Sequence, residues 1–440
     1  MQVAVLGCGH VGLVTAAALA SLGHEVLGLD QDQEKISLLK GGRCPFFEPG
    51  LPELVEREVA AGRLRFEVDD REAIAGAAVV FICVETPARA NGEANLVAVE
   101  RAARLIAPFL RGPTVVVEKS TVPAGTAQQL RKVLVHERPD LIDDLDVVSN
   151  PEFLREGQAV EDSLRPGRIL IGAPSRRAFD TMRAVYDPLI RDGHPLIETD
   201  IATAEIAKHA CNAFLALKIS YANALARLCE RLGADVTAVA DVMGSDARIG
   251  RAFLDAGLGY GGNCFPKDLQ AFERLSNRLG YDFPMLREVA RINDEAVQAT
   301  VDKIRDALWN LEDKRVALLG LSFKPGTDDI RLSPSLALAR RLLEEGAAVV
   351  GYDPQAGTEA KSELPELEVE STVYDALEGA HCMVMCTEWD EFRTLDLGKA
   401  KELLAYPIVV DGRNVFDPEE VGALGLVYYG TGRAARRDVG

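Results

Sequence analysis

The chain has 440 residues, of which 48% are hydrophobic, 27% charged and 6% aromatic, and this composition is typical of a globular protein, not of a disordered or fibrous one. At about 150 residues per domain, the length allows roughly two to four domains. Its 49 basic and 68 acidic side chains leave a net charge of −19. This charge argues against a broad surface for nucleic acid or anionic lipid, because such surfaces need clustered lysine and arginine.

The sequence shows no pattern typical of a leader, a membrane span or a metal site. Residues 1–7 lack the basic flank and cleavage site of a signal peptide, and no apolar run reaches the roughly 18 residues that a membrane span needs. The eight cysteines are scattered, and even Cys382 and Cys386 lie in an apolar, strand-like segment. We therefore expect a cytoplasmic protein with reduced thiols, without a metal and without nucleic-acid or membrane partners.

Short β-branched segments alternate with helical patterns in the first 200 residues. The predicted strands span residues 3–6, 25–29, 78–84, 114–119, 146–149 and 168–171. Strands separated by helices form parallel βαβ units with right-handed crossovers. Because residues 79–84 are apolar throughout, both faces of the sheet should be covered by helices. This region is predicted to be an open, doubly wound parallel sheet of the Rossmann type.

The first predicted turn carries a dinucleotide-binding pattern. Gly7-Cys8-Gly9-His10-Val11-Gly12 joins the first strand to a predicted helix at 13–22, and the next strand ends in Asp30. The glycines permit a tight turn and close approach of backbone N–H groups to a pyrophosphate, while the acidic residue accepts from a ribose hydroxyl. Asp30 would repel a 2′-phosphate and no arginine follows it, which favours NAD over NADP. His10 is interpreted as a turn residue and not as a catalyst.

A long helix is predicted from residue 203 to about 232, and a second, at 285–311, follows a glycine-rich loop at 257–262. Lys208 and Asn212 are four residues apart on the first of these helices and share a face. The flanking sequence is largely apolar, so the lysine could be partly desolvated and stabilise negative charge on oxygen. An ordinary solvated helix face is the alternative.

Cys264 lies in a segment of unusual composition, Gly261-Gly262-Asn263-Cys264-Phe265-Pro266-Lys267-Asp268. A glycine-rich loop beside a cation and an acid favours a thiolate nucleophile. The other cysteines are interpreted as structural, because most lie in apolar segments.

The alternation of strands and helices returns at residue 315. Strands are predicted at 316–320, 348–352, 382–387 and 408–410, with a helix at 335–345. The sequence therefore predicts two Rossmann-like α/β domains, residues 1–200 and 311–440, joined by a central helical domain, residues 201–310.

Six motifs in chain order resemble the UDP-glucose/GDP-mannose dehydrogenase family over almost the whole chain. They are residues 7–12, 119–126 (KSTVPAGT), 150–157 (NPEFLREG), the Lys208/Asn212 helix, 261–268 and 323–331 (FKPGTDDIR). The resemblance implies an N-terminal NAD-binding domain, a central region that forms a homodimer through its helices, and a C-terminal domain that binds the nucleotide sugar. Residues 245–250, 253–254, 387–389, 411–414 and 428–430 are more similar to UDP-glucose 6-dehydrogenases than to the GDP-mannose or UDP-N-acetylmannosamine enzymes.

The chain also departs from the family pattern. Glu85 stands where glycine is usual, Asn95 where aspartate is common, and Asn263 where serine is frequent. Because Glu85 adds negative charge close to the expected cofactor, it bears on cofactor affinity and not on the type of reaction.

The resemblance implies roles for single residues. Its catalytic positions match Cys264, Lys208, Asp268, Asn212, Glu152 and Thr121. Its cofactor-binding positions match Gly7, Gly9, His10, Val11, Gly12, Asp30, Lys35, Thr86, Thr121, Glu156, Lys267 and Arg331. Its substrate-binding positions match Glu152, Phe153, Leu154, Lys208, Asn212, Arg248, Phe253, Gly261, Lys324 and Arg413.

The expected reaction is the oxidation of the primary alcohol of UDP-glucose to a carboxylate, which removes four electrons and therefore reduces two NAD molecules. Cys264 would hold the aldehyde as a thiohemiacetal and then as a thioester that water releases. A GDP-mannose or UDP-N-acetylmannosamine dehydrogenase stays open as an alternative. A β-hydroxyacid-type dehydrogenase would make one NADH without needing Cys264, and a non-catalytic NAD-binding protein would make none.

Overall fold

The computed structural model describes residues 1–89 and 91–433, which form two compact units. The first unit comprises Met1–Cys211 and Gln270–Gly280, and the second comprises Asn212–Leu269 and the chain from Tyr281 onward. Within the described ranges, no helix combines the length and the apolar character that crossing a membrane requires. The predicted division into three domains at residues 200 and 310 stays a prediction.

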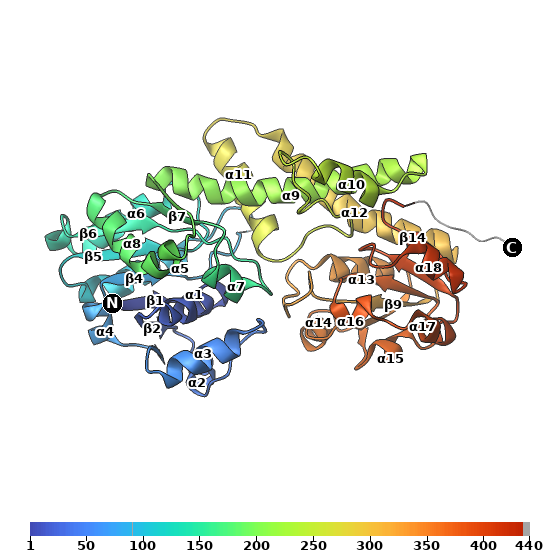
Figure 1. The fold of residues 1–440 in the computed structure, drawn as a ribbon, viewed down its shortest axis with the longest axis horizontal. Helices are drawn as coiled ribbons and strands as arrows, with labels where there is room; N and C mark the ends of the chain where they lie inside the picture. The colour runs from blue at the N-terminus through green and yellow to red at the C-terminus, as the bar shows by residue number, and fades with distance from the viewer. Residues whose placement is uncertain (90, 434–440) are drawn as a thin grey trace. The chain divides into compact units, whose positions relative to one another are not determined.

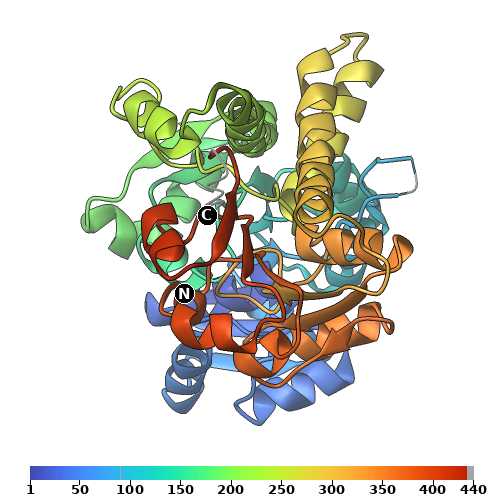
Figure 2. The same ribbon diagram turned by 90° about the vertical axis from the view of Figure 1, so that its right-hand side faces the viewer.

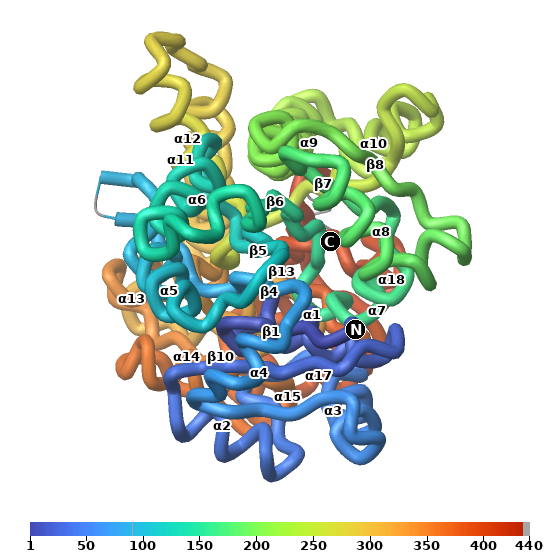
Figure 3. The backbone as a smooth tube through the Cα atoms, turned by 90° about the vertical axis from the view of Figure 1, so that its left-hand side faces the viewer, coloured from blue at the N-terminus to red at the C-terminus, as the bar shows by residue number. Residues whose placement is uncertain are grey.

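The first unit is built on one eight-stranded sheet (Figures 1 and 3). Its strands are β1 (Gln2–Leu6), β2 (Glu25–Leu29), β3 (Leu64–Glu67), β4 (Val79–Ile82), β5 (Thr114–Glu118), β6 (Leu145–Ser149), β7 (Ile169–Gly172) and β8 (Leu196–Thr199). They lie in the order β3-β2-β1-β4-β5-β6-β7-β8. The first six are parallel, which confirms the predicted doubly wound α/β class.

Two details of this sheet differ from the prediction. Strands β7 and β8 are parallel to each other, but β7 meets β6 in antiparallel orientation at Ser149 and Gly172. An antiparallel edge on an otherwise parallel sheet is common, because the edge needs no crossover helix. Strands β3 and β8 were not predicted. Both are four residues long, and each has exposed positions that interrupt the apolar pattern.

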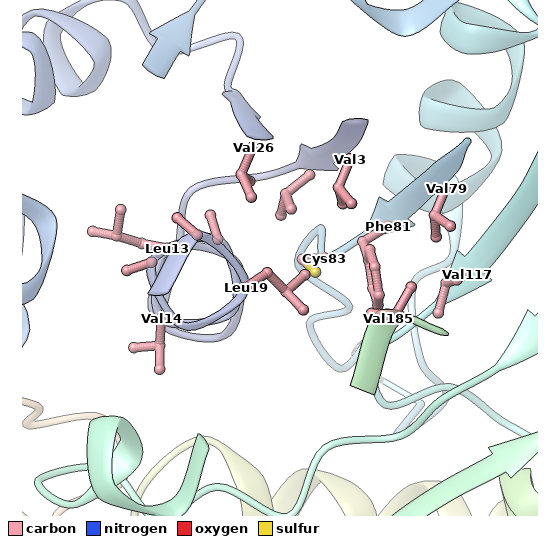
Figure 4. Packing of buried hydrophobic residues seen from close by; sticks show 14 of the residues in the cluster. Val3, Leu13, Val14, Leu19, Val26, Val79, Phe81, Cys83, Val117 and Val185 are labelled. Atoms are coloured by element: carbon pink, nitrogen blue, oxygen red, sulfur yellow. The ribbon is translucent and has the colours of Figure 1, made fainter. Parts of the chain in front are cut away.

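Helices cover both faces of the sheet because its central strands have buried side chains on both sides. The α-helices that lie wholly within this unit are α1 (His10–Ser21), α2 (Gln33–Lys40), α3 (Leu51–Ala60), α4 (Arg71–Gly76), α5 (Val97–Ile106), α6 (Thr126–Glu137), α7 (Ala159–Leu164) and α8 (Arg176–Arg191). Figure 4 shows one core, in which Leu13 and Leu19 of α1 lie near Val3, Val26 and other strand residues. Helices α4, α5 and α6 cover the opposite face.

The glycine-rich turn is set by close packing of backbone. Gly7 has φ +91°, which side-chain-bearing residues rarely adopt. A Cβ on Gly12 would lie 1.7 Å from the Gly7 carbonyl oxygen, so α1 can begin this close to β1 only with glycine there. A Cβ on Gly9 would meet no atom within 4 Å. The turn is therefore packed tightly on its protein side and open above Gly9.

Four helices follow the first sheet in the chain: α9 (Ile201–Leu232), α10 (Val236–Gly244), α11 (Cys264–Arg278) and α12 (Pro284–Leu308). Helices α9 and α12 confirm the two long helices predicted from the sequence. The boundary between the two units falls inside α9. In the second unit, Ala222 and Ala226 of α9 pack against Val236 of α10.

The second unit holds a six-stranded, fully parallel sheet (Figures 1 and 2). Its strands are β9 (Arg315–Leu319), β10 (Ala348–Tyr352), β11 (Glu368–Val369), β12 (Cys382–Met385), β13 (Ile408–Asp411) and β14 (Val427–Gly430), in the order β11-β10-β9-β12-β13-β14. Helices α12, α13 (Pro334–Glu344) and α14 (Gly357–Glu363) cover one face. Helices α15 (Val373–Leu377), α16 (Asp390–Arg393), α17 (Leu397–Leu403) and α18 (Pro418–Ala423) cover the other. The second predicted α/β sheet is confirmed.

Candidate active site

Asp30, which directly follows β2, holds the glycine-rich turn in place. The Asp30 carboxylate accepts hydrogen bonds from the backbone N–H of Cys8 at 2.8 Å and from the ammonium of Lys35 at 2.9 Å. Burial opposes ionisation of this carboxyl group, but the hydrogen bonds from Asp32, Cys8 and Lys35 outweigh it and lower the pKa of Asp30. Asp30 is therefore an ionised acceptor beside the turn, as the sequence predicts.

His10 is the first residue of α1 and not a turn residue, which corrects the interpretation from the sequence. Its ring stacks on Phe46, with the two ring centroids 3.7 Å apart. Since α1 begins immediately after Gly9, His10 lies in the first turn of a helix whose N-terminal N–H groups can serve an anion.

Two predicted cofactor residues meet at the carboxyl ends of β4 and β5. The hydroxyl of Thr86, which follows β4, donates to the backbone carbonyl of Thr121 at 2.9 Å. Thr86 is buried and Thr121 is half-buried. The hydrogen bond thus fixes the position of the loop that carries the Thr121 side chain.

A buried ion pair joins the loop after β6 to helix α9. The Lys208 ammonium lies 2.9 Å from the Glu152 carboxylate, and the two side chains are 4% and 5% exposed. Such a pair keeps both charges only if further polar contacts compensate for the lost water. The second Glu152 oxygen accepts from the backbone N–H of Leu154.

Arg168 is a member of this cluster that sequence reasoning missed. Its guanidinium lies 3.7 Å from the ring centroid of Phe153, and one of its nitrogens lies 3.5 Å from the Cys211 sulfur. The Lys208 ammonium lies 5.5 Å from the same ring. Both cations are within range of a cation–π interaction. Only the position of Arg168 as the first, charged residue of an otherwise apolar predicted strand could have drawn attention to it.

In the second unit, Cys264 is the first residue of α11. The prediction that this thiol lies in a loop is therefore wrong, because the loop ends at Asn263 and the helix begins at Cys264 itself. Its environment remains half-buried and not an apolar interior. Negative charge is stabilised at a helix N-terminus, so this position favours the thiolate form.

One helical turn further along α11, Asp268 lies in a polar network. The Asn212 amide donates to the Asp268 carboxylate at 2.6 Å, and the Lys267 ammonium donates to its other oxygen at 2.8 Å. All three side chains are at least nine-tenths buried. The structure thus joins Asn212, Lys267 and Asp268 within the second unit, while the Glu152–Lys208 pair belongs to the first.

The glycines before Cys264 allow a close approach of backbone segments. A Cβ on Gly261 would lie 2.3 Å from the Leu332 carbonyl oxygen, and one on Gly262 would lie 2.8 Å from the Phe323 ring. The predicted substrate residue Gly261 is therefore required by packing in the second unit. The neighbouring Phe253 has φ +65°, which is rare for a bulky residue.

Burial raises the pKa of several other thiols. It raises the pKa of Cys44 to about 11 and the pKa of Cys8, Cys382 and Cys386 to about 12. It also raises the pKa of Cys83. These thiols stay protonated near neutral pH, which agrees with their interpretation as structural residues.

Four further cations predicted to bind substrate or cofactor lie in the second unit. Arg413 donates to the backbone carbonyl of Cys386 at 2.8 Å, and Arg331 forms a forked ion pair with Asp329. Arg248 pairs with Asp246 and its side chain is 89% exposed. The side chain of Lys324 lies 5.5 Å from the Phe323 ring centroid. Glu156 lies in the loop before α7, where it is half-buried.

Together these groups supply the parts of an oxidation with a covalent intermediate. The first unit has an open glycine-rich turn with an acidic acceptor, and the second has a thiol at a helix N-terminus next to a buried carboxylate network. Each unit also carries a buried amine. Thiol, amine and carboxylate are the residue types that nucleophilic catalysis with proton transfer requires.

Comparisons with known proteins agree with this arrangement. Three descriptions of the UDP-glucose/GDP-mannose dehydrogenase family match in succession: the NAD binding domain at residues 1–190, the central domain at 202–295 and the UDP binding domain at 317–418. A UDP-glucose 6-dehydrogenase of Rhizobium meliloti is 44% identical over 437 residues, which cover 98% of this chain and 100% of that protein.

Solved structures show the same similarity. A UDP-glucose dehydrogenase from the archaeon Pyrobaculum islandicum superimposes with a TM-score of 0.91 at 38% identity, covering 98% of each chain. A UDP-D-ManNAc dehydrogenase from Pyrococcus horikoshii has a TM-score of 0.86 at 28% identity, covering 98% of this chain and 99% of its own.

Proposed function

The chain belongs to the UDP-glucose/GDP-mannose dehydrogenase family, and from this premise we propose that it oxidises the primary alcohol of UDP-glucose to the carboxylate of UDP-glucuronate with NAD. The observation that carries the proposal is the Cys264 thiol at the start of α11, one turn from Asp268 with its partners Asn212 and Lys267. A two-electron dehydrogenase has no need of such a nucleophile.

The residues of the first unit fit NAD. The space above Gly9 is open to a diphosphate, and Asp30 is held ionised beside the turn, where it suits an unphosphorylated ribose. Thr86 and Thr121 at the neighbouring strand ends, with Lys35 and Glu156, complete the proposed site in this unit. When bound, NAD accepts a hydride, and two NAD molecules are reduced in succession because four electrons leave the substrate.

Cys264 retains the sugar between the two oxidations. Its sulfur adds to the aldehyde carbon and forms a C–S bond, giving a thiohemiacetal whose oxidation leaves a thioester. Water then attacks the thioester carbon, the C–S bond breaks, and the thiolate is regenerated as the acid departs. The aldehyde is covalently held after it forms, which prevents its escape.

Neighbouring groups stabilise charge and move protons in this proposal. The Lys208 ammonium and the Asn212 amide stabilise the oxyanions that develop on the sugar carbon. Asp268 and Thr121 orient water and exchange protons, and Glu152 assists the hydrolysis of the thioester. The burial of the Glu152–Lys208 pair supports these roles, because a dry environment strengthens electrostatic stabilisation.

The nucleotide-sugar diphosphate needs cations. We assign this role to Lys324, Arg413 and Arg248, since a guanidinium can bind two phosphate oxygens at once. The anchoring of Arg413 to the Cys386 carbonyl supports it, because a held guanidinium loses less entropy on binding. We assign Phe153, Leu154, Phe253 and Gly261 to the sugar site. Lys267 and Arg331 are assigned to the cofactor because they match cofactor-binding positions of the family.

UDP-glucose is favoured over other nucleotide sugars by similarity. The UDP-glucose enzymes reach 44% and 38% identity, whereas the UDP-D-ManNAc enzyme reaches 28%. A GDP-mannose or UDP-N-acetylmannosamine substrate is the alternative. A single-step β-hydroxyacid-type dehydrogenase would also use Lys208 and Asn212 but would not need Cys264. An NAD-binding protein without activity would need neither Cys264 nor Lys208 and Asp268.

A homodimer through the central helices is part of the proposal. Phe214, Tyr221 and Leu228 on α9 are each at least half exposed in the single chain. Their seven-residue spacing places them in one stripe along the helix, which a second copy could cover. We also propose a cytoplasmic location, because no disulfide joins any of the cysteines in the described residues and the substrate and NAD are intracellular metabolites.

Counting cofactor against sugar tests this function. Purified protein is offered UDP-glucose, GDP-mannose or UDP-N-acetylmannosamine with NAD, and NADH absorbance is compared with sugar consumed. We expect about two NADH per UDP-glucose and little turnover of the other sugars. A ratio near one, or no oxidation of UDP-glucose, contradicts the proposal.

Asp30→Ala is expected to weaken NAD binding about tenfold, which corresponds to roughly 1.4 kcal/mol. The change removes both the ribose acceptor and the hydrogen bond that fixes Cys8 in the glycine-rich turn. NADH fluorescence titration measures the effect, with UDP affinity as an internal reference. Asp32→Ala is the control, since the Asp32 side chain caps α2 through the N–H groups of Glu34 and Lys35, while its backbone N–H, which donates to Asp30, is kept in the variant. If the wild-type protein, Asp30→Ala and Asp32→Ala bind NADH equally well, Asp30 does not contribute to NAD binding.

A further inference from the structure

Helices α6 and α7 are among the helices of the first unit that begin without a capping side chain of their own. Asp32, Asp70 and Ser175 cap α2, α4 and α8 from the position directly before each helix. In contrast, α6 begins after Gly125 and α7 after Gln158, and neither residue supplies a side-chain cap. These are the helices that follow the loops carrying Thr121 and Glu152.

Glu205, on α9, caps helix α6 from a distance in sequence. Its two carboxylate oxygens accept from the backbone N–H groups of Gly125 at 2.6 Å and Ala127 at 2.8 Å. Glu205 is 2% exposed. One turn further along α9, a ring nitrogen of His209 lies 2.9 Å from the Val122 carbonyl oxygen. Helix α9 therefore holds the Thr121 loop at both of its ends, from positions on either side of Lys208.

Glu48 caps helix α7 in the same way. Its two oxygens accept from the backbone N–H groups of Gly157 at 2.7 Å and Ala159 at 2.8 Å. Glu48 is 1% exposed and lies in the segment between α2 and α3. The loop it holds carries Glu152, Phe153 and Leu154. In both cases a single buried carboxylate binds one N–H in the loop and one in the first turn of the helix.

We propose that Glu48 and Glu205 are positioning residues of the reaction, which set the two active-site loops by capping the helices that follow them. The inference rests on the proposed function, which assigns the roles of Thr121, Glu152 and Phe153. Glu205 determines where Thr121 stands relative to Lys208, because both are tied to α9. Glu48 determines where the Glu152 loop ends.

Only a carboxylate satisfies this geometry fully. It presents two acceptors to two converging N–H groups, whereas a glutamine presents one acceptor and turns an N–H₂ group toward the second donor. A buried N–H left without a partner is unfavourable, so the loop is expected to move. Displacement of a reacting group by about 1 Å can reduce turnover on the order of 100-fold.

The test compares Glu205→Gln and Glu48→Gln with Glu58→Gln in the full-length protein. Glu58 is the matched control, because its carboxylate is also 1% exposed but pairs with Arg57 and Arg63 and caps neither loop. All three changes should lower Tm. Should Glu205→Gln fail to fold, Glu205→Asp keeps the charge with a shorter reach and is expected to show a smaller effect of the same kind.

Steady-state kinetics separate the two loops. Glu205→Gln is expected to lower kcat about 10- to 100-fold with KM for UDP-glucose within about threefold, because Thr121 is assigned to the orientation of water and the exchange of protons during the reaction. Glu48→Gln is expected to raise KM about tenfold, since Phe153 and Leu154 shape the sugar site. Glu58→Gln should retain wild-type kcat and KM per folded molecule. The inference is overturned if Glu205→Gln and Glu48→Gln also retain wild-type kcat and KM, or if they differ from the wild-type protein only in the fraction of folded molecules.

Hydrogen exchange without ligands provides a readout that does not depend on turnover. Peptides covering residues 120–130 should exchange faster in Glu205→Gln, and peptides covering 152–160 faster in Glu48→Gln, with neither change in Glu58→Gln. If hydrogen exchange in these peptides is unchanged, Glu205 and Glu48 do not hold the two loops and the inference is wrong. If the wild-type protein does not oxidise UDP-glucose while exchange changes as expected, the proposed function fails and the capping geometry stands.

Discussion

Cys264→Ser is expected to stop UDP-glucuronate formation, lowering its rate by roughly 1000-fold or more. A serine hydroxyl in the place of the thiol is almost fully protonated near neutral pH, so it is a much weaker nucleophile toward the aldehyde. The first oxidation does not require the thiol and should still yield NADH. Product analysis by mass spectrometry after a single turnover checks both statements.

The control for this change is Cys44→Ser, because Cys44 is also half-buried but burial raises the pKa of its thiol to about 11. We expect this variant to retain wild-type turnover. UDP-glucuronate formed at the normal rate by Cys264→Ser would show that the second oxidation proceeds through the free or hydrated aldehyde, and covalent catalysis would have to be abandoned.

Lys208→Met is expected to reduce kcat by about 100- to 1000-fold, the loss typical of removing one donor to a developing oxyanion. It should also destabilise the protein by about 3–5 kcal/mol, because the Glu152 carboxylate remains buried without its cation. Methionine keeps the length of the side chain, so the effect reports the charge. Stopped-flow NADH formation and urea unfolding measure the two losses separately.

The double variant Glu152→Gln with Lys208→Met separates stability from chemistry. Removing both charges restores most of the lost stability, since no unpaired ion stays buried. Activity should stay low, because the oxyanion donor is still missing. Recovery of turnover along with stability would mean that Lys208 serves the fold alone.

Local patterns made much of the site predictable. The glycine-rich turn and Asp30 lie within one strand–helix–strand unit, and their spacing alone indicates that they meet. The position of Cys264 at a helix start was missed, because Gly261-Gly262-Asn263 indicates a loop without showing where it ends. A proline two residues after the cysteine is a signal that could have located the helix, since proline is favoured in a first helical turn.

Contacts between distant segments could not be predicted in this way. Glu48 accepts hydrogen bonds from Gly157 and Ala159, which are 109 and 111 positions later in the sequence. The partners of Glu205 lie 80 and 78 positions earlier. No periodicity relates such pairs, and a glutamate on a helix is usually a solvated charge. Arg168 was missed for the same reason, because its contacts to Phe153 and Cys211 exist only after the sheet has formed.

The two sheets repeat one winding, since β3-β2-β1-β4-β5-β6 in the first corresponds to β11-β10-β9-β12-β13-β14 in the second. In each sheet the strand order reverses at one point, between β1 and β4 in the first sheet and between β9 and β12 in the second. Nucleotides bind in the crevice at such reversal points. Each unit therefore has its own reversal point, so a substitution beside the crevice of one sheet leaves the crevice of the other sheet intact.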